Sequence, residues 1–370
     1  MRVLNISLEK KLFIPRSPAQ KRVLSYSRLF ERFDLIVVTG KGQLRLEFDK
    51  IAIYPTNSLN KIVAPFNIYR SGKEIVKKYK SEVISVQDPF EIGLVGWLLA
   101  KKFGLKFHVQ IHGDYFGSPY WRQEKFLNRV RYYLGIFIVK RADAIRVVSQ
   151  RIKNQLIEKF GVAEKKITIV PIYTEVISHQ PSVASKKNDN KFVFLTVGRL
   201  VPVKNISLQI EAMAEIIKEY PTAELWIVGD GPEKSNLKSQ ISRLTVGQAN
   251  LKLENSVKLL GWQDKLEEFY QQADAFLLTS NYEGWGLVVV EAANYSLPII
   301  MTDVGCAGEI IKDKESGIIV PVGDVKKLTE AMLKVMKDDD LRRNLGTGAR
   351  SAIEKLPSKE QTLELYKKSW

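Results

Sequence analysis

The stretch TSNYEGWGLVVVEA, residues 279–292, predicts a loop that joins a buried strand to a helix. The apolar residues 275–278 just before it predict the strand, and Gly286 begins the predicted helix. Glu283 is therefore expected in a loop at the carboxyl end of a strand, and Glu291 one to two turns into the helix. Free backbone N–H groups and the positive dipole end of a helix N-terminus suit a phosphate or a sugar hydroxyl.

Two interpretations of these acids are open. Carboxylates accept hydrogen bonds from paired hydroxyls, so one acid would hold a sugar and the other a ribose. Alternatively, Glu283 is a solvated loop residue, and Glu291 is a helix acid favoured by the macrodipole.

Two further segments restrict the choice: VGRLVPVKN at residues 197–205 and TDVGCAGEII at residues 302–311. With them, the sequence resembles the retaining glycosyltransferases of family 4. The resemblance is dense from about residue 192 to residue 336 and looser before. It implies an α/β protein of the GT-B fold, with two Rossmann-like doubly wound domains that face each other across a cleft.

The expected domains follow from alternating strand and helix signals. Residues 1–177 form an acceptor-side domain, and residues 178–191, rich in Ser, Asn and Lys, form a linker. Residues 192–357 form the nucleotide-sugar domain. Residues 358–370 form a terminal helix, which the resemblance implies crosses back to the first domain.

Three local predictions are specific enough to be tested. A helix begins at Ser17 and Pro18 and runs to about Arg32, followed by a strand at residues 35–39. Residues 41–62 have no clear assignment. Trp262 is expected to be a packed aromatic, with stacking on a base as the alternative.

The resemblance implies a donor site in the second domain. Arg199 and Lys204 flank a predicted strand-to-helix loop, where two cations suit a diphosphate; the alternative is a pair of exposed surface cations. By resemblance these two stabilise the leaving group, Glu283 holds donor sugar hydroxyls and Glu291 holds the ribose. The other predicted donor contacts are Gly198, Gly229, Gly284, Trp285, Gly286, Leu287 and Val288.

In the first domain, His112 directly follows a predicted strand at residues 107–111. By resemblance it contacts the donor sugar; alternatively it caps the strand. Asp114 is a second candidate, although Asp beside glycine commonly serves a turn. The loop at residues 8–17 lacks the glycines typical of the family, and we predict acceptor phosphate contacts from its cations: Lys10, Lys11 and Arg16.

Charge is concentrated in the first half of the chain. Residues 1–180 contain 32 Lys and Arg against 15 Asp and Glu, while the whole chain has a net charge of +16. Such a field suggests an anionic partner, and a solvated lysine-rich surface is the alternative. Aromatic and basic residues interleave at residues 120–146. This segment either lies on an anionic bilayer or is an ordinary helix that buries Phe126, Val130 and Leu134. Nucleic acid is not expected, because no recognised binding module accompanies the charge.

Composition restricts the remaining classes. The single cysteine, Cys306, excludes an intrachain disulfide, and the three histidines show no metal-ligand spacing. No signal peptide is expected at the N-terminus, and the apolar runs are too short to span a bilayer. We therefore expect a cytoplasmic protein, or one peripheral to the inner face of the plasma membrane.

The resemblance implies transfer of a sugar from a UDP-sugar or GDP-sugar, with retention of anomeric configuration and without a metal or other cofactor. The expected acceptor is a glycan or a polyprenyl-diphosphate-linked glycan, in cell-surface polysaccharide synthesis. A nucleotide-sugar epimerase and a noncatalytic sugar-binding scaffold are the alternatives. The scaffold is disfavoured because Arg199, Lys204, Glu283 and Glu291 are all present.

Overall fold

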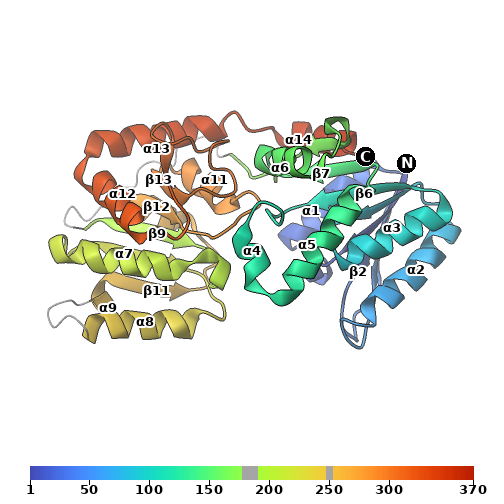
Figure 1. Ribbon diagram of the computed structural model, residues 1–370, viewed down its shortest axis with the longest axis horizontal. Coiled ribbons are helices and arrows are strands. Elements are labelled where there is room, and N and C mark those ends of the chain that lie inside the picture. The colour runs from blue at the N-terminus through green and yellow to red at the C-terminus, as the bar shows by residue number, and fades with distance from the viewer. Residues whose placement is uncertain (177–190, 247–252) are drawn as a thin grey trace. The chain divides into compact units, whose positions relative to one another are not determined.

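The computed structural model describes residues 1–176, 191–246 and 253–370 (Figure 1). The chain forms two compact units: unit 1 comprises Met1–Pro171 and Pro357–Trp370, and unit 2 comprises Ile172–Leu356. Apart from residue 191, the predicted linker at residues 178–191 lies outside the described residues. Each unit contains one largely parallel sheet with helices, so the prediction of two doubly wound α/β domains is confirmed.

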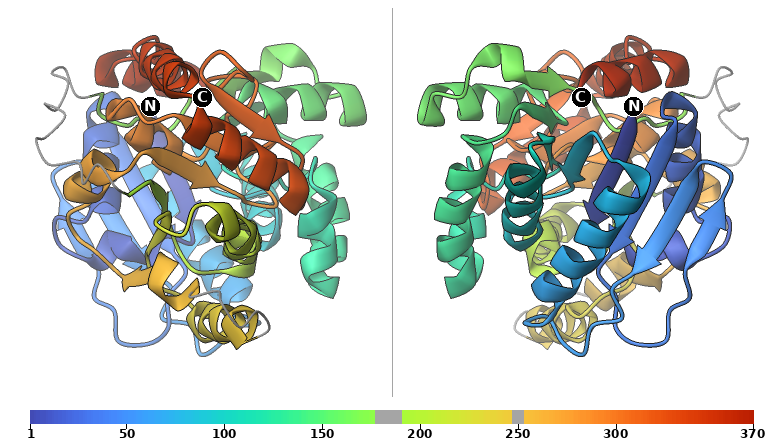
Figure 2. Two further views of the ribbon diagram at one scale, coloured as in Figure 1. Left: turned by 90° about the vertical axis from the view of Figure 1, so that its left-hand side faces the viewer. Right: turned by 90° about the vertical axis from the view of Figure 1, so that its right-hand side faces the viewer.

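Unit 1 contains an eight-stranded sheet of order β3-β4-β2-β1-β5-β6-β7-β8, in which only the β3–β4 pair is antiparallel. The right-hand view of Figure 2 shows this sheet with α2 and α3 against it. The strands are β1 (Arg2–Ser7), β2 (Arg32–Val37), β3 (Leu46–Phe48), β4 (Ile51–Pro55), β5 (Val83–Val86), β6 (Lys106–Ile111), β7 (Ala144–Val147) and β8 (Ile167–Ile169). The helices are α1 (Pro18–Tyr26), α2 (Ala64–Tyr79), α3 (Glu91–Phe103), α4 (Pro119–Glu124), α5 (Phe126–Val139), α6 (Gln150–Phe160) and α14 (Lys359–Lys368), with short 3-10 turns at η1 (Lys10–Phe13), η2 (Ser27–Leu29) and η3 (Glu164–Lys166).

The C-terminal helix α14 packs on unit 1. Ser358 is the N-cap of this helix and forms a capping box with Gln361. The Ser358 hydroxyl accepts from the backbone N–H of Gln361, and the Gln361 side chain accepts from the backbone N–H of Ser358. Tyr366 stacks on Tyr26 with a centroid separation of 4.1 Å. Trp370 meets the ring of Phe33 edge-on, so the end of the chain completes the core of unit 1.

This packing corrects the predicted second element. Helix α1 ends at Tyr26 rather than near Arg32, and β2 begins at Arg32 rather than at residue 35. Phe30 and Phe33 are both buried and stack on each other, which requires the chain to leave the helix before them. The unassigned residues 41–62 contain the β3–β4 hairpin.

Arg146 corrects the interpretation of the basic segment at residues 120–146. It lies on β7 and is buried, donating to Gln110 Oε1 at 3.0 Å and to the carbonyl of Val170 at 3.3 Å. Its guanidinium also lies 4.8 Å from the ring centroid of Tyr366. Arg146 is therefore part of the interior of unit 1 and not a surface cation.

Unit 2 contains a parallel six-stranded sheet of order β11-β10-β9-β12-β13-β14. Its strands are β9 (Val193–Val197), β10 (Glu224–Val228), β11 (Val257–Gly261), β12 (Ala275–Leu278), β13 (Ile299–Thr302) and β14 (Gly317–Val320). Its helices are α7 (Ile206–Glu219), α8 (Lys234–Val246), α9 (Leu253–Ser256), α10 (Glu267–Gln272), α11 (Leu287–Asn294), α12 (Val325–Lys337) and α13 (Asp339–Ile353), with a 3-10 turn at η4 (Pro202–Lys204). Trp262, just after β11, is 63% exposed and donates to Asp264, so the packed-aromatic prediction is wrong.

Candidate active site

The predicted donor residues gather where the strand order of unit 2 reverses. β9 is the first strand, β10 lies on one side of it and β12 on the other, so the loops after β9 and β12 border a topological switch point. Ligands of open parallel sheets bind in the crevice at such a point, outside the carboxyl ends of the strands. Lys204 and Glu283 come from these two loops.

Lys204 and Glu283 form an ion pair. Lys204 ends the turn η4, which Asn205 closes in the left-handed conformation at φ 46°, a backbone geometry that Asn tolerates better than most residues. The Lys204 ammonium donates to Glu283 Oε1, which also accepts a hydrogen bond of 2.8 Å from Ser280 Oγ. The site therefore holds one cation and one carboxylate side by side, about one fifth exposed at Lys204 and less at Glu283.

Hydrogen bonds lock the two loops together beneath this pair. Thr279 Oγ1 donates to the carbonyls of Lys204 and Asn205, at 3.2 and 3.1 Å. The backbone N–H of Asn281 donates to the carbonyl of Val203 at 2.8 Å. Because these contacts are buried or partly buried, the position of Lys204 relative to Glu283 is built into the unit.

The N-terminus of α11 follows directly after Glu283. Gly286 is its N-cap at φ 94°, a conformation that a residue with a Cβ rarely adopts. Trp285 is buried beside it, and its carbonyl accepts from the N–H of Cys306 at 2.9 Å, which ties in the loop after β13. Gly284, Trp285, Gly286, Leu287 and Val288 thus form the predicted strand-to-helix turn.

Glu291 lies in the second turn of α11, as predicted. Its Oε2 accepts a hydrogen bond of 2.9 Å from the hydroxyl of Tyr270, on α10. Tyr270 is buried, and burial together with the charge of Glu291 raises its pKa above the ordinary value, so it stays a donor. Sequence reasoning missed both Tyr270 and Ser280, because neither residue type carries a signal without knowledge of its neighbour.

The glycines after β9 and β10 approach each other closely. A Cβ on Gly229, at φ 145°, would lie 1.8 Å from the carbonyl oxygen of Gly198. Only glycine at residue 229 permits this contact, which brings the two strand ends together. Arg199 follows Gly198 and is exposed.

In unit 1, His112 follows β6 and is partly exposed. Partial burial of the ring, together with the positive charges of Arg146 and Arg22, lowers the pKa of His112 to about 3. The imidazole is therefore neutral at physiological pH and offers one donor and one acceptor. Asp114 accepts a 2.8 Å hydrogen bond from the N–H of Gly117, the turn role that was its alternative.

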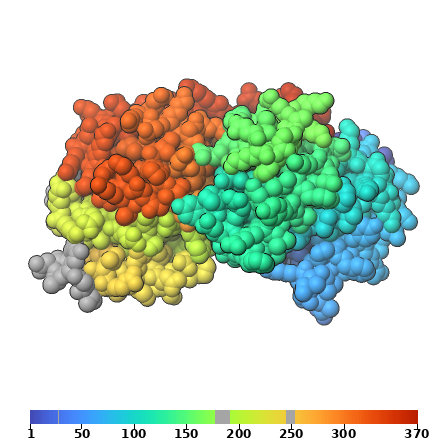
Figure 3. Space-filling view, viewed as in Figure 1, coloured from blue at the N-terminus to red at the C-terminus, as the bar shows by residue number. Residues whose placement is uncertain are grey.

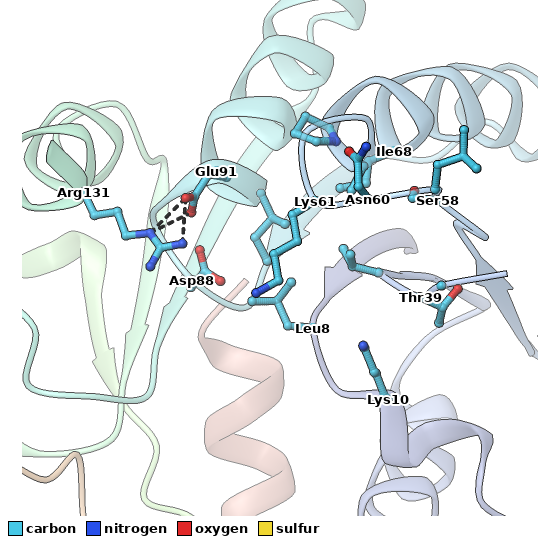
Figure 4. Close-up of a pocket in the computed structure, with 16 residues that line it drawn as sticks. Leu8, Lys10, Thr39, Ser58, Asn60, Lys61, Ile68, Asp88, Glu91 and Arg131 are labelled. Atoms are coloured by element: carbon cyan, nitrogen blue, oxygen red, sulfur yellow. Dashed lines mark hydrogen bonds and ion pairs between the residues drawn. The ribbon is translucent and has the colours of Figure 1, made fainter. Parts of the chain in front are cut away.

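A pocket of 410 Å³ lies at the switch point of unit 1, between β1 and β5 (Figure 4). Its walls come from the segments after β1, β2, β4 and β5 and from α2, α3 and α5. Of the three predicted acceptor cations, Lys10 lines this pocket, whereas Lys11 and Arg16 are exposed outside its lining.

Four charged residues that line this pocket were not identified as site residues from the sequence: Lys61, Asp88, Glu91 and Arg131. Asp88 is buried after β5, and burial raises its pKa to about 6 although its Oδ1 accepts the N–H of Phe90 at 2.9 Å. Glu91 begins α3 and pairs with Arg131 of α5 at 2.8 Å. Figure 4 shows Arg131 and Glu91 on one side of the pocket and Asp88 nearer its centre.

Within the residues that the structure describes, no group of three or more His, Cys, Asp or Glu is placed to hold a metal ion. The same part of the chain contains no helix with the length and apolar character needed to span a bilayer.

The fold defines the class of protein. The lipopolysaccharide outer core galactosyltransferase WaaB superimposes with a TM-score of 0.75 over 100% of this chain and 99% of its own, at 18% sequence identity. The two units thus have the GT-B architecture of glycosyltransferases.

Family models then identify the family. "Glycosyltransferase Family 4" matches residues 22–172, and "Glycosyl transferases group 1" matches residues 180–352. The chain belongs to glycosyltransferase family 4, as the sequence motifs suggested. Its relatives include an uncharacterized glycosyltransferase of Methanocaldococcus jannaschii, which is 26% identical over 89% of this chain and 88% of the relative. The UDP-Gal:alpha-D-GlcNAc-diphosphoundecaprenol alpha-1,3-galactosyltransferase of Escherichia coli is 27% identical over 72% of this chain and 69% of the relative.

Proposed function

We propose that this glycosyltransferase moves a sugar from a UDP-sugar or GDP-sugar to a glycan or lipid-linked acceptor, with retention of configuration and without a metal ion. The observation that carries the proposal is the paired Lys204 and Glu283 beside the N-terminus of α11, with Glu291 one turn further on. A cation, free backbone N–H groups and two carboxylates are the groups that a nucleotide-diphosphate sugar requires.

The charges match the chemical difficulty of the reaction. As the anomeric carbon–oxygen bond breaks, negative charge grows on the diphosphate and positive charge grows on the sugar. Arg199 and Lys204 stabilise the diphosphate, the electrostatic work that a metal ion performs elsewhere. Glu283 binds sugar hydroxyls, and Glu291, oriented by Tyr270, binds the ribose.

The acceptor hydroxyl attacks on the face that the diphosphate leaves, and its proton passes to the departing phosphate oxygen. One carbon–oxygen bond forms as another breaks, so no separate protein base is needed. Neutral His112 contacts the donor sugar through one ring nitrogen, and its low pKa keeps it from adding a positive charge beside the anomeric carbon. The E. coli relative, named for a UDP-Gal donor and a diphosphoundecaprenol-linked acceptor, supports a uridine donor and a lipid-linked acceptor here. We place the reaction in cell-surface polysaccharide synthesis at the cytoplasmic face of the membrane.

The test begins with the donor. Thermal unfolding is followed with UDP, GDP and their sugars, on the wild type and on Lys204→Ala and Glu291→Ala. Stabilisation by one nucleotide that both variants lose supports the donor site. Lys327→Ala is the matched control, because Lys327 pairs with Glu330 on the exposed face of α12.

Incubation of the stabilising UDP-sugar or GDP-sugar with chelator and candidate acceptors then tests the reaction, with the anomeric configuration of the product read by NMR. A product of inverted configuration contradicts the retaining mechanism, and loss of activity in the chelator contradicts metal independence. Conversion of the donor sugar without any acceptor indicates the epimerase. If no nucleotide stabilises the wild type, the donor site is wrong.

A further inference from the structure

Helix α5 exposes an apolar stripe that its fold leaves uncovered. Phe126, Val130 and Tyr133 are 79%, 53% and 72% exposed, and their spacing of four and three residues places them on one face of the helix. Atoms of the α4–α5 segment lie on the visible face of the space-filling view (Figure 3). The alternative interpretation of this segment, an ordinary helix that buries Phe126 and Val130, is therefore wrong; Leu134 is half-buried.

The other face of α5 fixes the orientation of this stripe. Asn128 is buried and donates to the carbonyl of Trp121 at 2.8 Å. Gly135 is buried against Phe116, where a Cβ would come within 2.9 Å of the ring. Arg131 is held by Glu91. Since these contacts occupy one side of the helix, the apolar stripe cannot turn inward without breaking them.

Cations flank the stripe, and acids are scarce. Lys125 and Arg129 are exposed beside it. In the whole α4–α5 segment, residues 119–141, Glu124 is the single acid among six Lys and Arg. Exposed aromatic and aliphatic side chains next to cations match the boundary between acyl chains and anionic headgroups.

A second exposed apolar group lies around the start of α2, beside residues that line the pocket. Leu59, Ile62 and Phe66, before and within the first turn of α2, are 71%, 88% and 67% exposed, and Lys61 stands among them. Residues 57–69 contain no acid. The start of α2 and the N-terminal end of α5 both lie in the lower part of unit 1 in Figure 1.

The pocket borders both groups. Arg131 of α5 lines it, and so do Leu59, Lys61 and the start of α2; Figure 4 shows Arg131 at one side of the pocket. We propose that this edge of unit 1, defined by Phe126, Val130, Tyr133, Leu59, Ile62 and Phe66 with Lys125, Arg129 and Lys61, docks on a bilayer that contains anionic lipid. The pocket then opens at the membrane surface and receives an acceptor held there by a lipid tail; this last step rests on the proposed transfer function.

The test is flotation of the full-length protein with vesicles, without donor or acceptor. We expect binding to phosphatidylcholine vesicles that contain phosphatidylglycerol, much less binding to phosphatidylcholine alone, and weakening by salt. Lys125→Gln/Arg129→Gln should lower the partition coefficient about 25-fold, from about fivefold for each cation near the surface. Phe126→Ser/Tyr133→Ser should lower it about tenfold or more.

The matched control is Lys77→Gln/Lys165→Gln, which removes the same charge. Lys77 is exposed in the last turn of α2, and Lys165 lies just before β8. Both cations are therefore near the amino ends of the strands, whereas the pocket lies at the carboxyl ends. We expect a change of less than about twofold for the control, because neither cation belongs to the proposed contact surface.

Three results would overturn the docking proposal: a wild type that does not float with anionic vesicles, equal binding to neutral vesicles, or equal loss in the control. The first of these points to a protein partner for the apolar edge. Stabilisation by UDP or GDP, measured on the same variants, should match the wild type, because the substituted residues lie in unit 1. The vesicle experiment can therefore refute the docking surface without refuting the donor site, and the nucleotide experiment can refute the donor site without refuting the docking surface.

Discussion

Replacing Glu283 by glutamine is expected to tighten the binding of UDP while it lowers sugar transfer. In the free protein, Lys204 is paired with Glu283, so a diphosphate must compete with this carboxylate for the ammonium. The amide keeps the size of the side chain and an oxygen for the hydroxyl of Ser280, which now donates at 2.8 Å. It removes the charge that competes with the phosphate and the second acceptor that would hold a sugar hydroxyl.

The burial of the pair sets the magnitude. The two side chains are 20% and 15% exposed, between a surface pair worth about 0.2–1 kcal/mol and a fully buried pair whose breakage costs about 3–5 kcal/mol. We take about 1.4 kcal/mol, which corresponds to about tenfold tighter UDP binding for Glu283→Gln. Lys204→Ala removes a charged hydrogen bond to phosphate, worth about 2 kcal/mol, and should weaken UDP binding about 30-fold.

Titration calorimetry measures the affinity of both variants for UDP, or for GDP if thermal unfolding shows that GDP is the nucleotide that stabilises the protein. Lys327→Ala, on the exposed pair of α12, should bind as the wild type does. If Glu283→Gln binds the nucleotide no more tightly than the wild type, Glu283 does not compete for Lys204, and the argument from their pairing is refuted. A Lys204→Ala variant of unchanged affinity would remove Lys204 from the donor site altogether.

Three further predictions concern the supporting structure. Tyr270→Phe, which removes the hydrogen bond that orients Glu291, should weaken nucleotide binding about fivefold in the same titration, while an unchanged affinity would show that Glu291 needs no support. Gly229→Ala should lose about 3 kcal/mol in urea unfolding because its Cβ meets a carbonyl, and an unchanged midpoint would contradict the close approach. Burial lowers the pKa of His108 to about 3 in the folded protein. Below about pH 6.5 the unfolded chain therefore binds a proton at His108 that the folded protein does not bind, which favours unfolding. From pH 7 to pH 5 His108 should cost about 2 kcal/mol of stability in urea titrations, beside the loss from His112, whose pKa is lowered in the same way. His108→Asn should therefore lose less stability over this range than the wild type, and an equally steep variant would assign the loss to other groups.

The fold was predictable wherever apolar strands and helix caps stand close together in the sequence. Strands β6 and β12 were predicted within one residue, because each is a short apolar run bounded by a turn or a helix. The end of α1 was not predicted correctly, because it depends on a distant residue. Trp370, at the other end of the chain, packs against Phe30 and Phe33. Local periodicity contains no information about such a contact.

Charge was a poor guide to exposure. Arg146 was counted with the surface cations although it is buried, because the sequence does not show that β7 interrupts the basic segment. The partners of Arg146 come from other elements: Gln110 lies on the neighbouring strand β6, and Tyr366 lies on α14. Conversely, Phe126 and Val130 have the spacing of a core stripe and are exposed. Periodicity predicts that a face exists, and only the packing of Asn128 and Gly135 decides which face turns inward.

The pocket of unit 1 marks the limit of prediction by motif, although a physical rule reaches part of it. Asp88 lies two residues after the end of β5, and polar residues at the carboxyl ends of parallel strands are candidates for binding. That rule alone selects Asp88. Glu91 and Arg131 join it only because the strand order places β5 next to β1 and α5 beside α3. The family motifs are dense in unit 2, where the donor is expected, and sparse in unit 1. Acceptor choice therefore has to be argued from burial and charge, and a buried acid with a pKa of about 6 beside an ion pair is the strongest such feature there.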